Sequence, residues 1–160
     1  MPRRPRRLIT VAVSVSLVIV VGATAAYLLL PPRQTGSVAV PPSAASPEQV
    51  VTAYLDALNQ HDCDTAATLM TADAQDSARS WCTSVASLTD VVVRDHTTER
   101  PEHSGHSEPD EVVNVQVTFD LDWRPFHDDG SLGEGVTDWG YLLVRSSPDS
   151  PWRIVDQGRG

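Results

Sequence analysis

Cys63 and Cys82 are the only two cysteines of the chain, and they carry the clearest chemistry in the sequence. An even number of cysteines in an oxidising compartment favours one disulfide. The bridge would close a loop of about 20 residues and stabilise the fold by about 3 kcal/mol in the chain-entropy model. The alternative is a pair of buried free thiols. A metal site is not expected, because no histidine stands at ligand spacing from either cysteine.

Two other clusters contain residue types that bind metal ions. His103 and His106 have the spacing of a helical metal site, but they lie among Gly, Pro and Ser residues, which favours solvated loop histidines. Asp128-Asp129-Gly130 resembles part of a calcium loop, yet the EF-hand pattern is absent, so a turn is the better interpretation. No G-x-S-x-G, HExxH, P-loop or GxGxxG motif occurs. We therefore expect neither a metal nor a cofactor.

Alternating side chains predict the strand that must support any site. From Glu111 to Trp123 the apolar residues occupy every odd position: Val113, Val115, Val117, Phe119, Leu121 and Trp123. The even positions from Asn114 to Asp122 are polar. One dry face and one wet face are typical of a strand in an antiparallel sheet.

A strong helix start stands at Ser46. Ser46 is a good cap, Pro47 suits the first turn, and Gln49 completes a capping box. The apolar residues that follow form one wide stripe at helical spacing: Val50, Val51, Tyr54, Leu55 and Leu58.

The remaining elements give the fold class. A second helix, capped by Asp62 or Asp64, is expected to run to Met70, and a third over 74–81. Further strands are expected at three places, with a polar loop at 97–110: 88–95, 138–146 and 152–157. Helices followed by strands predict an α+β fold, in which three helices pack on a curved antiparallel sheet of about four strands.

The N-terminal region predicts membrane attachment. Residues 8–30 are 23 residues without a charge, long enough to cross a bilayer of ~30 Å as one helix. The arginines of residues 1–7 favour a cytoplasmic N-terminus, and Pro31-Pro32 ends the run. The expected organisation is a basic tail at 1–7, a transmembrane helix at 8–30, a flexible linker at 31–45 and an extracytoplasmic domain at 46–160.

A cleaved signal peptide is the alternative to this anchor. Ala23-Thr24-Ala25 fits the small-x-small cleavage rule. However, apolar residues continue to Leu30, beyond a normal signal core. The retained anchor in the cell membrane is therefore the preferred interpretation.

The charge distribution excludes one class of partner. From Glu48 onward, seven arginines stand against 21 acidic residues, a net charge of about −14. Such a surface repels phosphate backbones, so nucleic-acid binding is not expected.

Two stretches carry a resemblance to a known superfamily: PEQVVTAYLDALNQHDCDTAATLM and DWGYLLVRSSPDSPWRIVDQG. Residues 46–158 resemble the nuclear transport factor 2-like superfamily, with its cystatin-like cone of a curved sheet around a helix. The cysteine pair is similar to that of membrane-anchored extracytoplasmic bacterial members. The superfamily includes isomerases, dehydratases, SnoaL-like cyclases and secretion-channel components, so the resemblance does not select one activity.

The resemblance implies a site inside the cone. Tyr54, Trp123, Tyr141 and Asp156 are the candidate pocket residues. Asp156 is the one candidate catalytic acid, because it would be buried in the cone if its side chain points inward beside Ile154. The alternative is that Asp156 only ends the strand. No acid or base stands on the apolar face of the strand from Glu111 to Trp123.

We therefore expect a non-enzymatic, membrane-tethered extracytoplasmic domain that binds a protein partner or a small apolar ligand. One alternative is an assembly subunit of a cell-envelope or secretion complex. The other is a cyclase- or isomerase-like enzyme that uses Asp156.

Overall fold

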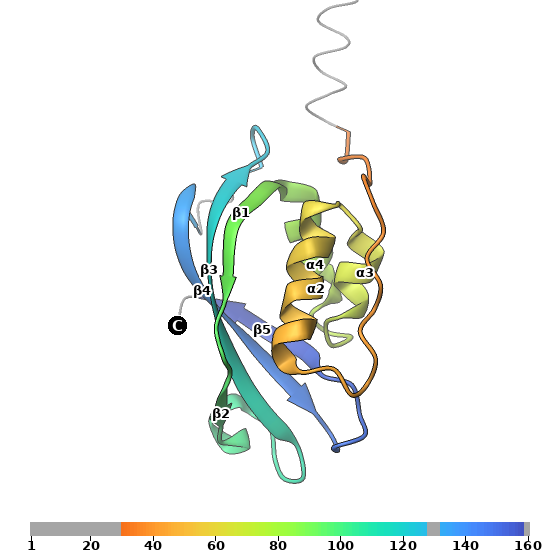
Figure 1. The fold of residues 1–160 in the computed structure, drawn as a ribbon, viewed down its shortest axis with the longest axis vertical. Helices are drawn as coiled ribbons and strands as arrows, with labels where there is room; N and C mark the ends of the chain where they lie inside the picture. The colour runs from red at the N-terminus through yellow and green to blue at the C-terminus, as the bar shows by residue number, and fades with distance from the viewer. Residues whose placement is uncertain (1–29, 128–131, 159–160) are drawn as a thin grey trace, which may run out of the picture. The chain divides into compact units, whose positions relative to one another are not determined.

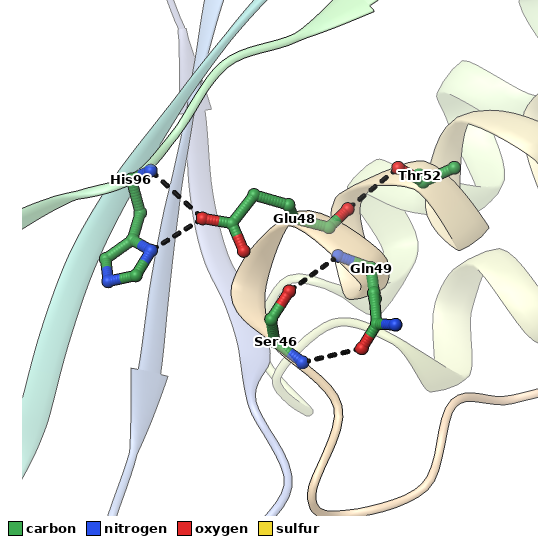
Figure 2. A network of polar contacts seen from close by, with 5 residues as sticks. All are labelled: Ser46, Glu48, Gln49, Thr52 and His96. Atoms are coloured by element: carbon green, nitrogen blue, oxygen red, sulfur yellow. Dashed lines mark hydrogen bonds and ion pairs between the residues drawn. The ribbon is translucent and has the colours of Figure 1, made fainter.

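The first described helix begins where the capping signal predicts. The computed structural model describes residues 30–127 and 132–158. Helix α2 spans Pro47–Asn59. The Gln49 backbone N–H donates to Ser46 Oγ over 3.4 Å, and the Ser46 N–H donates to Gln49 Oε1 over 2.9 Å (Figure 2). This reciprocal pair is the capping box, so the predicted helix start is confirmed.

Two shorter helices follow α2 and are joined to one another by a disulfide. Helix α3 spans Cys63–Thr68 and helix α4 spans Gln75–Ser84. The bridge links Cys63, at the start of α3, to Cys82, near the end of α4. The predicted disulfide is confirmed, and the alternative of two free thiols is wrong.

Five strands form one antiparallel sheet on the other side of the domain (Figure 1). Their bounds are β1 Val85–Val93, β2 Thr97–Glu99, β3 Glu111–Trp123, β4 Gly135–Arg145 and β5 Arg153–Gly158. The order across the sheet is β1-β3-β4-β5, and β2 also pairs with β3. A short 3-10 helix, η1, spans Pro101–Ser104.

The expected number of strands was wrong, because the polar loop predicted at 97–110 contains β2. This strand has only three residues and is largely exposed, so it leaves no alternation for a pattern to detect. Its pairing partner explains why it forms: Thr97, Thr98 and Glu99 stand opposite Asn114, Val113 and Val112. Strands β1 and β2 therefore pair with the same edge of β3, one after the other along its length.

The expected fold class included an N-terminal transmembrane helix, and the structure corrects this part as well. Among residues 30–127 and 132–158, no helix is long and apolar enough to cross a bilayer. The longest, α2, has 13 residues, against the ~20 that a span requires. Residues 8–29 of the expected span lie outside the described residues.

The segment 32–45 lies against the domain. It has no helix or strand, but hydrogen bonds at Thr35 and Val38 hold it. The Thr35 N–H donates to the Gln60 carbonyl over 2.8 Å, and the Val38 N–H donates to Asp62 Oδ2 over 2.9 Å. The side chain of Val38 packs on the hydrophobic core. Hydrogen bonds therefore hold this segment against the turn between α2 and α3.

The core lies between the helices and the inner face of the sheet. All six odd-numbered apolar residues of β3 from Val113 to Trp123 are buried, as the alternation predicted. Tyr54, Leu55 and Leu58 of α2 face them from the helical layer and are also buried. The helices cover one face of the sheet (Figure 1). The even-numbered polar residues of β3, from Asn114 to Asp122, lie on the other face.

Candidate functional site

Two tyrosines meet at the centre of the core with their hydroxyl groups unpaired. Tyr54 comes from α2 and Tyr141 from β4, and both are fully buried. Their ring centroids lie 5.6 Å apart in an edge-to-face arrangement. Within the described part of the chain, neither hydroxyl has a hydrogen-bond partner. Buried polar groups are almost always paired, so such a group needs an explanation.

Gln157 stands beside this tyrosine pair because strand β5 contains a bulge. Leu143 pairs with Ile154 but Leu142 pairs with Asp156, so Val155 is the extra residue. The bulge reverses the alternation of the strand, and Gln157 comes opposite Tyr141. Both polar atoms of the Gln157 side chain are buried and have no hydrogen-bond partner among the residues that the structure describes.

A cluster of three tryptophans borders the same region. Trp81 of α4 lies 5.4 Å from Trp123 and 5.5 Å from Trp139, measured between ring centroids. The Trp123 indole N–H donates to the Leu132 carbonyl over 2.8 Å. The indole nitrogen of Trp139 is buried without a partner in the described residues. The cluster therefore presents one unsatisfied donor.

Trp81, Trp139 and Gln157 line a partly enclosed cavity of about 300 Å³. Its lining is mostly apolar and comes from α4, β4, β5 and the segment after α3: Met70, Ala74, Ser77, Trp81, Trp139, Val155, Asp156 and Gln157. A volume of this size is at the lower end of small-molecule sites. Trp139 and Gln157, which carry buried polar atoms, are thus among the residues that line a space suited to a small ligand.

The two buried tyrosines are uncharged at neutral pH. Burial raises the pKa of Tyr54 well above its ordinary value, and the nearby Gln157 side chain offsets only part of that effect. Burial, together with Tyr54, also raises the pKa of Tyr141 well above its ordinary value. Both hydroxyls therefore stay protonated at neutral pH and do not serve as bases.

The structure separates the four candidate pocket residues of the sequence. Tyr54 and Tyr141 meet in the core. Trp123 is displaced from the cavity wall by Trp81, which it contacts. Asp156 is solvent-exposed at the rim of the cavity, where its carboxylate accepts from the Gln157 N–H over 2.8 Å. Asp156 thus does not face the core, because the bulge turns Gln157 inward in its place.

Three residues of this site were missed by sequence reasoning. Trp81, Trp139 and Gln157 line the cavity, yet none of them was among the candidate site residues of the sequence. The abundance of tryptophan was the one usable signal. Gln157 gave none, because a bulge has no sequence signature of its own in this strand. Within the described residues, no three His, Cys, Asp or Glu side chains are grouped so that they could hold a metal ion.

A second, larger cleft of about 590 Å³ lies at the start of α2. Two of its charged groups, Arg145 and Glu111, pair with one another. Arg145 donates to Glu111 Oε2 over 2.6 and 3.1 Å and stacks on Trp152, with its guanidinium carbon 4.5 Å from the ring centroid. This cleft carries no unsatisfied buried side-chain atom in the described chain, so the smaller cavity is the better candidate site.

Glu48 joins α2 to the sheet beside this larger cleft. His96 approaches Glu48 Oε1 with its Nδ1 at 2.6 Å and its backbone N–H at 3.0 Å (Figure 2). Burial alone would raise the pKa of Glu48, but hydrogen bonds from Ser46 and His96 outweigh it and hold this pKa at about 2. The charged carboxylate is therefore the form that folding favours.

We expect Glu48→Gln to lower the free energy of unfolding by about 1 kcal/mol at pH 7, because the pair is partly exposed and screened by solvent. The contribution of ionised Glu48 to the free energy of unfolding is complete above its ordinary pKa of 4.5 and is lost as the pH falls toward 2. In urea titrations, the difference in the free energy of unfolding between variant and wild type should therefore disappear as the pH falls from 4.5 to 2. Glu102→Gln, at an exposed position, is the control. A gap that stays constant with pH would contradict the assignment.

Two comparisons with known proteins bear on this chain. Residues 48–158 match the family model described as a domain of unknown function, DUF4829. The solution structure of a SEC-C motif-containing protein from Rhodopseudomonas palustris matches with a TM-score of 0.50 and 14% identity, over 74% of this chain and 81% of that chain. At this identity the likeness concerns the fold alone. No curated protein matches. The resemblance to the nuclear transport factor 2-like superfamily stays a prediction.

Proposed function

The chain belongs to the DUF4829 family, whose domain has no known function, and we propose that it is a non-enzymatic binding domain for a small apolar ligand in an extracytoplasmic compartment. The ligand would occupy the cavity between α4, β4 and β5. Membrane attachment is not part of this proposal, because no described helix supports it.

The observation that carries the proposal is a set of buried polar atoms without partners next to an apolar cavity. Trp139 Nε1 and both polar atoms of Gln157 belong to residues that line the space, and the hydroxyls of Tyr54 and Tyr141 lie behind them. An unsatisfied buried polar atom is destabilising by about 1–3 kcal/mol. The apolar body of a ligand in this space would cover Trp81 and Met70.

The cavity wall favours binding over catalysis. Acid–base catalysis needs a group whose pKa lies near the working pH. The buried tyrosines have pKa values raised away from neutrality. The one carboxylate in the lining, Asp156, is exposed to solvent. An enzyme that uses Asp156 as a buried acid is therefore the weaker candidate.

The disulfide supports the proposed compartment. A bridge between Cys63 and Cys82 forms and persists in an oxidising environment, and such bridges are rare in the cytosol. Cys82 is fully buried, and Cys63 packs against the core.

Filling the cavity should abolish binding. Ser77 lines the cavity from α4, whereas Ser80 lies one turn further along the same helix, is exposed and does not line it. We expect the neutral solvatochromic dye prodan to bind the wild-type chain with a blue shift of its emission. Ser77→Trp should weaken this binding about 10-fold or more, because the indole occupies the ligand volume. Ser80→Trp is the matched control and should bind as the wild type does.

The proposal fails on either of two results. One is an emission spectrum of prodan that does not change with the wild-type chain at any concentration tested. The other is equal binding by wild type and Ser77→Trp, which would place the dye elsewhere on the domain. Equal thermal unfolding of the two serine variants would show that loss of binding does not reflect loss of folding.

A further inference from the structure

One edge of the sheet is left open over a few residues. Strand β1 comes first in the order β1-β3-β4-β5, and no other strand of the described residues pairs with its outer edge. We propose that residues 90–94 form a self-association surface, on which a second copy of this chain adds its own β1 in antiparallel orientation. This surface is separate from the cavity of the proposed function, because no residue of β1 lines that cavity.

Helix α2 closes the outer edge of β1 on either side of these residues. The side chain of Asn59 accepts from the Leu88 N–H over 2.7 Å and donates to the Leu88 carbonyl over 2.8 Å. Beyond the strand, the His96 N–H donates to Glu48 Oε1 over 3.0 Å (Figure 2). Between these two positions, no residue of α2 hydrogen-bonds to residues 89–95 in the described chain. Only this central part of the edge is therefore open to a partner strand.

The pairing of β1 with β3 shows which backbone groups face the open edge. The Arg94 N–H donates to the Gln116 carbonyl of β3 over 2.9 Å. Backbone groups of successive residues in a strand point to opposite edges, so those of Val93 point away from β3, while those of Val92 point toward it. In a symmetric antiparallel pairing centred on Val92, the two Val92 residues form a non-hydrogen-bonded pair. Val93 then exchanges hydrogen bonds with the partner's Val91.

The sequence of this segment complements itself. In antiparallel orientation about Val92, Asp-Val-Val-Val-Arg places valine opposite valine at its three central positions. The same register places Asp90 of each copy opposite Arg94 of the other. The Arg94 guanidinium donates to Thr118 Oγ1 over 3.2 Å, and Thr118 pairs with Val92, so the positive charge lies at this edge. Opposite charges directly across a strand pair stabilise it and like charges destabilise it, so a second copy is a suitable partner.

Exposed valines give the open edge an apolar surface to bury. Val91 is 38% and Val92 is 54% exposed, and Val93 packs partly on the core. Edge strands usually carry charges, prolines or bulges that prevent pairing. Here the bulge lies at Asp90, where the register shifts between Thr89 and Val92 and the backbone φ is 51°. It ends the regular edge at Asp90 but leaves the three valines uncovered.

Cysteine crosslinking of the full chain tests the surface and its register. Cys63 and Cys82 are bonded to one another, so an added cysteine is the only free thiol. Physiological salt screens the repulsion between two acidic domains beyond about 8 Å. The Cα atoms of a non-hydrogen-bonded pair lie about 4.5 Å apart, within the range of a disulfide. Under a mild oxidant, Val92→Cys should therefore form a disulfide-linked dimer about 10-fold or more faster than Val136→Cys.

Val136 is the matched control because it is more exposed, at 77%, and lies on β4, on the far side of β3 from β1. A Val92→Cys chain that does not crosslink would overturn the proposal. Crosslinking of Val136→Cys at the same rate or faster would also overturn it, because the copies would then meet through another surface.

Exchange of charges tests the pairing of Asp90 with Arg94. In chains that also carry Val92→Cys, Arg94→Glu should slow crosslinking about 10-fold, because it places a carboxylate opposite the partner's Asp90. Arg79→Glu makes the same change at an exposed position of α4 and should leave the rate unchanged. Equal rates for these two variants would overturn the register.

A mixture of two variants provides the rescue. Asp90→Lys alone should also slow crosslinking, because it places two cations opposite one another. An equal mixture of the Asp90→Lys and Arg94→Glu chains should restore the rate, since both charge pairs of the mixed dimer are then complementary. Equal thermal unfolding of the two variants would show that both remain folded. A mixture that crosslinks no faster than its components would overturn the pairing of these residues.

Discussion

Replacing Cys63 and Cys82 together by serine is expected to lower the free energy of unfolding by about 3 kcal/mol. The bridge joins residues 19 positions apart and holds α3 to α4. Without it, the unfolded chain gains the conformational freedom of that closed loop. A domain of this size is only marginally stable, so a loss of this size would markedly increase the unfolded fraction.

Urea unfolding of the double variant and of the oxidised wild type measures this effect. Wild type treated with a reductant should unfold at the same urea concentration as the double variant, because both lack the bridge. A loss below about 1 kcal/mol would mean that helix packing alone holds α3 and α4 together. The cavity lies partly on α4, so prodan binding should weaken in parallel with the loss of stability.

Asp62→Ala is expected to have a similar effect of about 3 kcal/mol. Asp62 is only 5% exposed, and its two carboxylate oxygens have different partners. Oδ1 accepts from the Thr65 N–H over 3.3 Å and caps α3, while Oδ2 accepts from the Val38 N–H over 2.9 Å. The Val38 contact, followed by those of Thr65, holds the pKa of Asp62 below its ordinary value, although burial opposes this shift. Alanine would leave both N–H groups without this acceptor.

Asp62→Asn is the matched control, because its amide keeps one oxygen to accept a hydrogen bond. It should lose about 1 kcal/mol. Hydrogen exchange at the Val38 amide tests the contact with Val38 separately from the cap of α3 at Thr65. The exchange rate of the Val38 amide should rise sharply in Asp62→Ala. An unchanged exchange rate would show that Asp62 does not hold the segment 32–45 on the domain.

Asp62 thereby connects the N-terminal segment to the disulfide-bonded helices. The segment reaches Asp62 at Val38, and Asp62 immediately precedes Cys63. The family match begins at residue 48, so this contact joins residues outside the match to residues inside it.

Local signals in the sequence were enough for the elements whose causes are local. The capping box at Ser46 and the alternation from Val113 to Trp123 each depend on neighbouring residues, and both are confirmed. Helix α3 begins at Cys63 with Asp62 as its cap, one of the two caps expected. Helix α4 starts within one residue of its predicted position but runs on to Ser84, directly before β1.

The elements that were missed or misplaced depend on partners distant in the chain. Strand β2 exists because β3 offers free edge groups beside β1. The start of β1 at Val85 likewise reflects its pairing with Trp123. The expected membrane helix is corrected for the described residues, and the remainder of that run lies outside them.

The sequence by itself determined the α+β arrangement, the cysteine pair and the acidic surface, because periodicity, composition and cysteine number act locally or as totals. Only the tertiary structure decided the site. A single bulge at Val155 places Gln157 opposite Tyr141 and leaves Asp156 at the rim. Side-chain direction in a strand has a period of two, so one extra residue exchanges which neighbour faces the core. No local pattern records that exchange, because the pairing between β4 and β5 creates it.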